Sequence, residues 1–167
     1  MKFAIIGDGA VGKNNLLRSF IQNQFQYRYM PTTFTNEFHI TIAQNNQQSF
    51  NLILTDTSGS SGFNRIRCYS YVNVDVFIVC YSVENHFSLN NVVNRWIPEM
   101  RGYKSDVPFI LVGTKCDLNN ALSERADEIV KQFNARSHVL CSAVYQFNVK
   151  RVFHEAVRVA LENDLNK

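Results

Sequence analysis

An eight-residue run near the N-terminus, Gly7-Asp8-Gly9-Ala10-Val11-Gly12-Lys13-Asn14, matches the phosphate-binding pattern G-x-x-x-x-G-K-[ST] at every position but the last. An apolar stretch over residues 3–6 precedes it and predicts a buried strand, and apolar residues at helical spacing follow it (Leu16, Leu17, Phe20 and Ile21). Glycines between a strand and a helix let the backbone fold closely around a polyphosphate, with N–H groups and the helix N-terminus facing the anion. The run therefore predicts a polyphosphate-binding loop.

The last position of the pattern is where this chain departs from it. The pattern has Ser or Thr there, because the hydroxyl is a ligand of Mg²⁺, whereas the chain has Asn14. Mg²⁺ demands near-ideal oxygen geometry, and the reach of an amide carbonyl differs from that of a hydroxyl by one bond. Asn14 therefore predicts a weakened metal site, unless a small shift of the loop lets its carbonyl coordinate adequately. Lys13 adds a point charge for the outer phosphates. Gly9, Gly12 and Lys13 are expected to hold phosphates, and the other nucleotide-binding residues expected in this loop are Ala10, Val11, Asn14 and Asn15.

Length and composition predict one compact cytosolic domain over residues 1–167. Hydrophobic residues make up 46% of the 167 residues, enough for a single core. The net charge of +3 is spread along the chain, which argues against nucleic acid as a partner. The four cysteines and four histidines show neither disulfide nor metal-ligand spacing, so the thiols are expected to be reduced. The first strand starts too early to leave room for a signal peptide, and no apolar stretch nears the roughly 20 residues that span a bilayer.

Apolar strand-like runs alternate with amphipathic helical patterns along the chain. This alternation predicts an α/β fold, in which helices cover both faces of a mostly parallel sheet. The two runs over 37–43 and 49–55 are joined by a short polar tract, which predicts a hairpin. The expected strands cover residues 3–6, 37–43, 49–55, 74–83, 107–113 and 138–141.

Three more motifs each follow a strand. In Asp56-Thr57-Ser58-Gly59, the Asp can hold the hydration shell of Mg²⁺ and the Gly N–H can meet a γ-phosphate. In Thr114-Lys115-Cys116-Asp117, the carboxylate can accept two hydrogen bonds from guanine that adenine cannot donate. In Cys141-Ser142-Ala143, a backbone N–H can contact the guanine O6. Open α/β sheets bind ligands at the carboxyl ends of their strands, so the four motifs together predict a guanine-nucleotide site.

In order and spacing these motifs resemble those of the small GTPases of the Ras superfamily, over essentially the whole chain. The Rho branch is the most similar. Tyr29-Met30-Pro31-Thr32-Thr33-Phe34 resembles its first switch, and Thr114 in place of the commoner Asn of the guanine motif is also familiar there. The second switch and the segment after it are similar at Arg65-Ile66-Arg67, Ser70-Tyr71, Asp75-Val76-Phe77 and Arg95-Trp96-Ile97-Pro98-Glu99.

The resemblance implies the P-loop NTPase fold with a doubly wound, six-stranded sheet, and GTP or GDP with Mg²⁺ as cofactors. Asn14, Thr32 and Asp56 would organise the metal, and Lys13, Thr32 and Ser60 would act in hydrolysis. Exchange factors and effectors would bind the switches at about 25–36 and 57–71, with effectors at Thr32 and Phe34. The other implied nucleotide contacts are Phe25, edge-on to the base, and Tyr29, Gly59, Thr114, Lys115, Asp117, Ser142 and Ala143.

Residue 60 is a second departure from the family pattern. Family members follow the D-x-x-G glycine with Gln, which orients the attacking water, and this chain has Ser60 followed by Ser61. Serine is too short to reach the γ-phosphate and the water together, and a misplaced nucleophile can cost about 100-fold in rate. We therefore expect very slow intrinsic hydrolysis, unless Asn64 or a residue of a partner takes the place of the Gln.

Three further departures concern partners. The stretch from Asn119 to Leu140 is too short for the extra helix of Rho proteins, so contacts through that helix should be absent. Thr55 stands where Rho members often carry Trp, so exchange-factor selection is expected to differ. Residues 161–167 contain no C-a-a-X box and no polybasic tail, which predicts no prenyl anchor if this is the natural end of the protein.

These features lead to two principal hypotheses. The first is a Rho-like GTPase in signalling and cytoskeletal regulation, whose switches order in response to the nucleotide and whose turnover is slow. The alternative is a pseudo-GTPase, GDP-locked or nucleotide-free, that sequesters an exchange factor or scaffolds partners. Asn14 favours this alternative, since in the family an Asn in place of the loop Ser or Thr is associated with weakened Mg²⁺ and GTP binding. Thr32 and the guanine motif instead favour the Rho-like GTPase. An ATP-dependent enzyme such as a small kinase would leave Asp117 unexplained.

Overall fold

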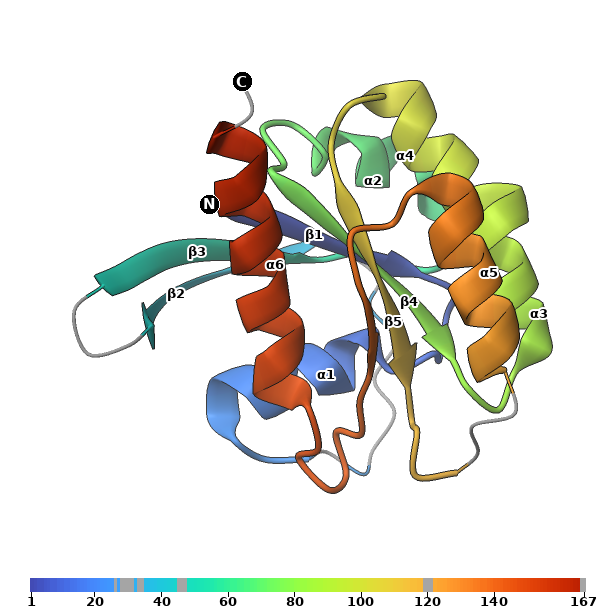
Figure 1. The fold of residues 1–167 in the computed structure, drawn as a ribbon, viewed down its shortest axis with the longest axis horizontal. Helices are drawn as coiled ribbons and strands as arrows, with labels where there is room; N and C mark the ends of the chain where they lie inside the picture. Colours follow the sequence, from blue (N-terminus) through green and yellow to red (C-terminus); the bar gives the residue numbers. More distant parts are fainter. Residues whose placement is uncertain (26, 28–31, 33–34, 45–47, 119–121, 166–167) are drawn as a thin grey trace.

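The computed structural model describes residues 1–25, 27, 32, 35–44, 48–118 and 122–165. Within these residues one six-stranded sheet forms the centre, in the order β2-β3-β1-β4-β5-β6. Helices cover both of its faces (Figure 1). Strand β2 pairs antiparallel with β3, and the other neighbouring strands run parallel. The expected doubly wound, mostly parallel α/β fold is therefore confirmed.

The elements follow the predicted order with modest changes at their ends. The strand expected over 74–83 is shorter, because the chain is still turning at Val74, whose N–H donates to the carbonyl of Tyr71. The strands are β1 (Lys2–Gly7), β2 (Asn36–Gln44), β3 (Gln48–Asp56), β4 (Val76–Ser82), β5 (Phe109–Thr114) and β6 (His138–Leu140). The helical segments are α1 (Lys13–Gln22), η1 (Ser61–Phe63), α2 (Asn64–Tyr69), α3 (His86–Asn91), η2 (Val92–Trp96), α4 (Ile97–Tyr103), α5 (Ser123–Phe133) and α6 (Val149–Leu165).

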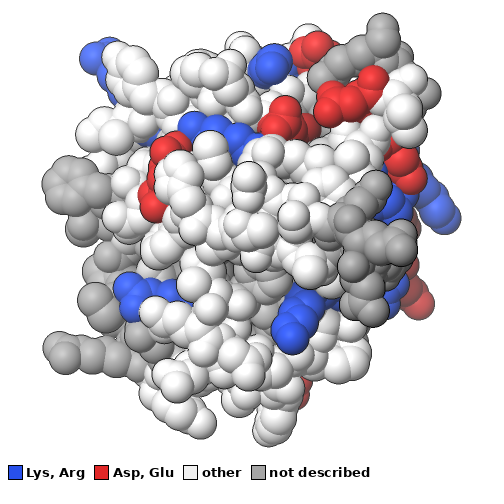
Figure 2. Space-filling view, turned by 90° about the vertical axis from the view of Figure 1, so that its left-hand side faces the viewer, with Lys and Arg blue, Asp and Glu red and all other residues white. Residues whose placement is uncertain are grey.

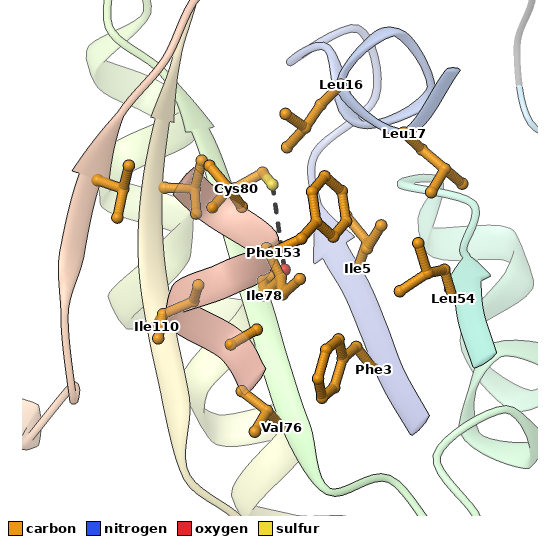
Figure 3. Close-up of a cluster of buried hydrophobic side chains, with 14 of the residues drawn as sticks. Phe3, Ile5, Leu16, Leu17, Leu54, Val76, Ile78, Cys80, Ile110 and Phe153 are labelled. Atoms are coloured by element: carbon orange, nitrogen blue, oxygen red, sulfur yellow. Dashed lines mark hydrogen bonds between the residues drawn. The ribbon is translucent and has the colours of Figure 1, made fainter. Parts of the chain in front are cut away.

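The central strands are apolar on both faces, which is why they appear as continuous apolar runs in the sequence. On one face, Phe3 and Ile5 of β1 pack with Leu16 of α1 and Phe153 of α6 (Figure 3). The ring of Phe153 also stacks on Phe20 of α1 at 3.9 Å between centroids. The alternate residues of the same strands form a second cluster under the opposite helices: Ala4, Ile6, Phe77, Val79, Tyr81, Phe109 and Leu111. Two cores thus hold the sheet between two helical layers.

The helical stretch from His86 to Tyr103 contains a wider turn. The segments α3, η2 and α4 follow one another from His86 to Tyr103, and η2 is a π-helical turn. Near this turn, Trp96 Nε1 and Asn91 Nδ2 donate to the two carboxylate oxygens of Asp8, at 2.8 and 2.7 Å. The helix is thereby fastened to the predicted phosphate loop.

The structure also bears on the cysteines and on membrane spans. All four cysteines lie in the described part of the chain and are free, and Cys80 and Cys141 are buried. Among the described residues no helix combines the length and apolar character needed to cross a membrane.

Candidate functional site

The four sequence motifs meet at one edge of the sheet. Strand β1 ends at Gly7, β3 at Asp56, β5 at Thr114 and β6 at Leu140, directly before the last motif. A pocket of about 510 Å³ opens at this edge. The predicted site residues that line it are Gly9, Ala10, Gly12, Lys13, Asn14, Asn15, Thr32, Gly59, Ser60 and Lys115.

The backbone of the phosphate loop requires small residues. Gly12 has a φ of 101°, in the region that favours glycine, and α1 begins directly after it. The unpaired N–H groups of the first turn of α1 therefore face the pocket. Gly59 is required by a close approach, because a Cβ there would lie 2.3 Å from the backbone nitrogen of Gly9. A larger residue at 59 would push the loop after β3 away from the phosphate loop.

Lys13 occupies the floor of the pocket. Its Nζ donates to the carbonyl oxygens of Gly7 and Asp8, at 2.8 and 2.7 Å. Burial lowers the pKa of Lys13, and the negative charge of Asp56 opposes this effect. Phosphate oxygens beside the ammonium would favour its charged form. This placement suits the phosphate contact expected of Lys13.

Of the three residues expected to organise Mg²⁺, Asn14 and Thr32 both bind Asp56. Asp56 Oδ2 accepts a hydrogen bond from Thr32 Oγ1 at 2.9 Å and another from Asn14 Nδ2 at 3.3 Å. Burial raises the pKa of Asp56, against the opposing effect of the Thr32 hydrogen bond. The other oxygen, Asp56 Oδ1, is buried and has no hydrogen-bond partner among the described residues. A buried carboxylate oxygen of this kind suits the hydration shell of a divalent cation.

The donor set fits Mg²⁺ in part. Asp56 and Thr32 supply oxygen atoms, whereas Asn14 directs its amide nitrogen, a hydrogen-bond donor, at the carboxylate. No group of three His, Cys, Asp or Glu side chains suited to a metal occurs in the described ranges. A metal here would therefore depend on phosphate oxygens and water for most of its ligands.

The guanine motif is tied to the phosphate loop. Thr114 is buried, and its hydroxyl donates to the carbonyl oxygens of Val11 and Tyr81, so this side chain supports the loop from behind. Lys115 lines the pocket and its Nζ pairs with Glu84 at 2.7 Å. The N–H of Cys116 donates to the carbonyl of Cys141 at 3.1 Å, which places the last two motifs side by side.

Some predicted contacts lie outside the pocket lining. Val11 is a core residue, and Asp56 lies beneath the pocket, where Thr32 and Asn14 cover it. The lining also excludes Phe25, Thr114, Asp117, Ser142 and Ala143, of which Asp117 is exposed at the surface. Tyr29 and Phe34 lie outside the described residues.

Ser60 lines the pocket and is held through its backbone. Arg67 Nη1 donates to the carbonyl oxygens of Ser58 at 2.6 Å and Ser60 at 3.0 Å. The side-chain oxygen of Asn64 accepts hydrogen bonds from Arg67 and Arg95. The oxygen of the Asn64 side chain is therefore occupied by two arginines, and the role of Asn64 in place of the Gln stays a prediction.

The pocket also contains residues that sequence reasoning missed. Tyr27, Ser58 and Phe63 line it. Ser58 belongs to a predicted motif, which is a signal that could have identified it. No spacing pattern marks Tyr27 or Phe63. In the sequence, the buried Arg67 that binds the Ser60 carbonyl stands out only as part of the family-like stretch Arg65-Ile66-Arg67.

Comparisons with known proteins agree with this geometry. The model of the Ras family matches residues 2–162. The "GTP-binding protein RHO4" of Saccharomyces cerevisiae is 40% identical over 99% of this chain, and a "GTP-binding RHO-like protein" of Candida albicans is 40% identical over 94%. The "Ras-like GTP-binding protein RhoL" of Drosophila melanogaster is 38% identical over 95%. The chain spans 59% and 45% of the lengths of the two fungal proteins and 85% of the length of the fly protein.

Proposed function

The chain belongs to the Ras family of small GTPases and is Rho-like, and we propose that it works as a guanine-nucleotide-dependent switch with slow GTP hydrolysis and weakened Mg²⁺ binding. One observation carries the proposal: Lys13, Thr32 and Gly59, from three separate segments, line a single pocket. A γ-phosphate in this pocket could contact all three, so its presence or absence would change how the segments pack.

Each group at the site would have a distinct task. Lys13 and the N-terminal N–H groups of α1 would bind the phosphates. Mg²⁺, when bound, would neutralise charge on the phosphates, and Asp56 and Thr32 would help to hold it. Asp117 would accept hydrogen bonds from the guanine base, and the loop at Ser142 and Ala143 would contact its O6. Phe25, Tyr29 and the phosphate loop would complete the contacts.

Slow hydrolysis follows from the side chain at position 60. The hydroxyl of Ser60 stands where the family has a longer amide, and Arg67 holds the backbone of Ser60 by its carbonyl. In this proposal neither the short side chain of Ser60 nor Asn64, whose side-chain oxygen binds Arg67, would hold the attacking water in line. We expect exchange of the nucleotide, more than its hydrolysis, to set how long the protein stays active. Exchange factors and effectors would bind the two switches, in a cytoplasmic signalling role that includes the actin cytoskeleton.

A second candidate function rests on the contact between Asn14 and Asp56. The amide N–H of Asn14 donates to Asp56 Oδ2, so it would compete with Mg²⁺ and its waters for this carboxylate. If this contact persists with nucleotide bound, the protein would favour GDP or the nucleotide-free form. It would then act as a binding module that sequesters an exchange factor.

The test is the affinity of the purified protein for fluorescent GDP and for a fluorescent non-hydrolysable GTP analogue, each with and without Mg²⁺. Tight binding of both nucleotides, strengthened by Mg²⁺ and resistant to competition by ATP, would support the switch. A strong preference for GDP, or binding indifferent to Mg²⁺, would support the binding module instead. Equal competition by ATP would contradict both.

A further inference from the structure

The loop between β6 and α6 carries three exposed apolar side chains that the nucleotide site does not use. Val144, Tyr145 and Phe147 are 41%, 73% and 54% exposed. The guanine contact expected from this loop involves only Ser142 and Ala143, at its start. Large apolar side chains concentrated in a four-residue stretch of surface indicate an interaction site.

The loop is held in shape by its polar groups. Ser142 and Phe147 exchange two backbone hydrogen bonds of 2.9 Å, which closes the loop. The side chain of Gln146 donates to Ser19 Oγ on α1 and to the carbonyl of Ala143. Asn148 Nδ2 donates to the carbonyl of Leu140 at 2.9 Å. The polar side chains thus bind neighbouring parts of the protein, while the apolar ones remain exposed.

The chain segment that contains this loop carries basic but no acidic side chains, and the exposed Asp117 on the neighbouring loop belongs to the guanine motif. Lys150 and Arg151 are exposed on the first turn of α6, and residues 141–154 contain no Asp or Glu. Helix α1 packs beside α6, and residues 9–36 contain no Asp or Glu either. Figure 2, which looks at the side where these helices lie, shows basic side chains in both halves of the view and acidic ones mainly in the upper half. The first acidic residue along α6, Glu155, is paired with Arg158 at 2.9 Å.

We propose that the loop at residues 144–147 and the basic start of α6 form a docking surface for an anionic lipid membrane. Lys150 and Arg151 would lie among the negatively charged headgroups, to which a segment with basic and no acidic side chains over residues 141–154 is complementary. Tyr145 and Phe147 would enter the boundary between headgroups and acyl chains, where aromatic side chains are favoured. A short projecting loop also suits a broad, planar partner. This mode of binding requires neither a spanning helix nor nucleotide turnover.

Sedimentation with lipid vesicles tests the proposal. The full chain, loaded with GDP, is mixed with vesicles of phosphatidylcholine alone or with about one-third phosphatidylserine. We expect sedimentation only with phosphatidylserine, and a roughly fivefold lower partition coefficient for each of Lys150→Ala and Arg151→Ala. Tyr145→Ser together with Phe147→Ser should lower it by about tenfold or more. Circular dichroism and GDP affinity should be unchanged, since none of the four side chains lines the pocket or is among the residues expected to contact the nucleotide.

Matched substitutions elsewhere on the protein distinguish binding through this surface from non-specific adsorption to the vesicles. Tyr69→Ser removes an aromatic side chain that is 79% exposed on α2, and Lys131→Ala removes an exposed cation on α5. Neither should change sedimentation. Equal losses for these variants and for the loop variants would overturn the proposal, as would binding to phosphatidylcholine alone to the same extent.

Tryptophan fluorescence supplies an independent measurement. The single natural tryptophan, Trp96, is fully buried, so in Tyr145→Trp the loop is the source of any change in emission. The emission should shift to the blue on phosphatidylserine vesicles and be quenched by brominated acyl chains. Emission that stays unchanged on vesicles would contradict insertion of the loop. If soluble polyglutamate shifts the emission and the vesicles do not, the surface binds an acidic protein segment and the membrane proposal fails.

Discussion

Arg67 and Glu99 lie 32 residues apart in the sequence and form a two-bond ion pair in the fold. Arg67 Nε lies 2.8 Å from Glu99 Oε1, and Nη2 lies 2.6 Å from Oε2. The Arg67 side chain is fully buried, and Tyr71 also donates to Glu99. Since the same guanidinium binds the carbonyl oxygens of Ser58 and Ser60, one buried charge joins α2, α4 and the loop after β3.

Removing one partner of this pair should destabilise the protein. Arg67→Met leaves Glu99 without its cation and the two loop carbonyls without a donor, at a cost of about 3 kcal/mol in the free energy of unfolding. Urea denaturation measures this cost, and Arg65→Met, at an exposed position on the same helix, is the control and should cost little. Adding Glu99→Leu to Arg67→Met should recover part of the loss. A double variant less stable than Arg67→Met would mean that the buried carboxylate is not the source of the cost.

The same pair predicts a loss of stability in acid. Burial alone would raise the pKa of Glu99, but hydrogen bonds from Arg67 and Tyr71 outweigh it and lower the pKa below its ordinary value of 4.5. The unfolded chain therefore takes up this proton before the folded protein does. The ionised Glu99 carboxylate contributes fully to the free energy of unfolding above pH 4.5. This contribution is lost as the pH falls through the lower pKa of Glu99 in the folded protein. Urea midpoints measured across this range should fall less steeply with acid for Glu99→Gln than for the natural protein. Parallel curves for the two proteins would exclude Glu99 as a contributor.

Lengthening the side chain at position 60 should accelerate hydrolysis. In Ser60→Gln, an amide can reach the attacking water beside the γ-phosphate, and we expect the single-turnover rate to rise by about ten- to 100-fold. Rapid-quench measurement of GTP cleavage tests this rise. Ser61→Gln places the same side chain one residue later, outside the pocket lining, and should leave the rate unchanged. If Ser60→Gln is no faster than the natural protein, the limiting defect lies elsewhere, with Asn14 the next candidate.

Restoring a hydroxyl at position 14 should strengthen the metal site. Asn14→Thr removes the amide N–H that meets Asp56 Oδ2 and supplies an oxygen ligand for Mg²⁺. We expect the Mg²⁺ concentration that half-maximally slows nucleotide release to fall by about tenfold. Release of fluorescent GDP across a series of free Mg²⁺ concentrations measures it, with Asn15→Thr as the neighbouring control. The same Mg²⁺ dependence in Asn14→Thr and the natural protein would show that Asn14 already coordinates adequately.

The sheet and most of its helices were predictable because their patterns are local. The runs at residues 3–6 and 107–113 are continuously apolar, as is typical of strands that helices cover on both faces. The helical stripe of Val152, Phe153, Ala156 and Val157 likewise predicts the buried face of α6. Long-range contacts of polar side chains leave no such signal. The bonds from Trp96 and Asn91 to Asp8 depend on a π-helical turn that no apolar spacing predicts.

The sequence by itself determined the fold class, the phosphate loop and the two unusual residues, Asn14 and Ser60. It could do so because strand and helix periodicity and the glycine pattern of a phosphate loop are properties of short segments. Only the tertiary structure decided that Asn14 meets Asp56, that Arg67 holds the backbone of Ser60, and that Tyr145 and Phe147 stay exposed beside Lys150. Those relationships join residues from separate segments or depend on which side chains the packed core leaves outside. They exist only once hydrophobic burial has brought the segments together.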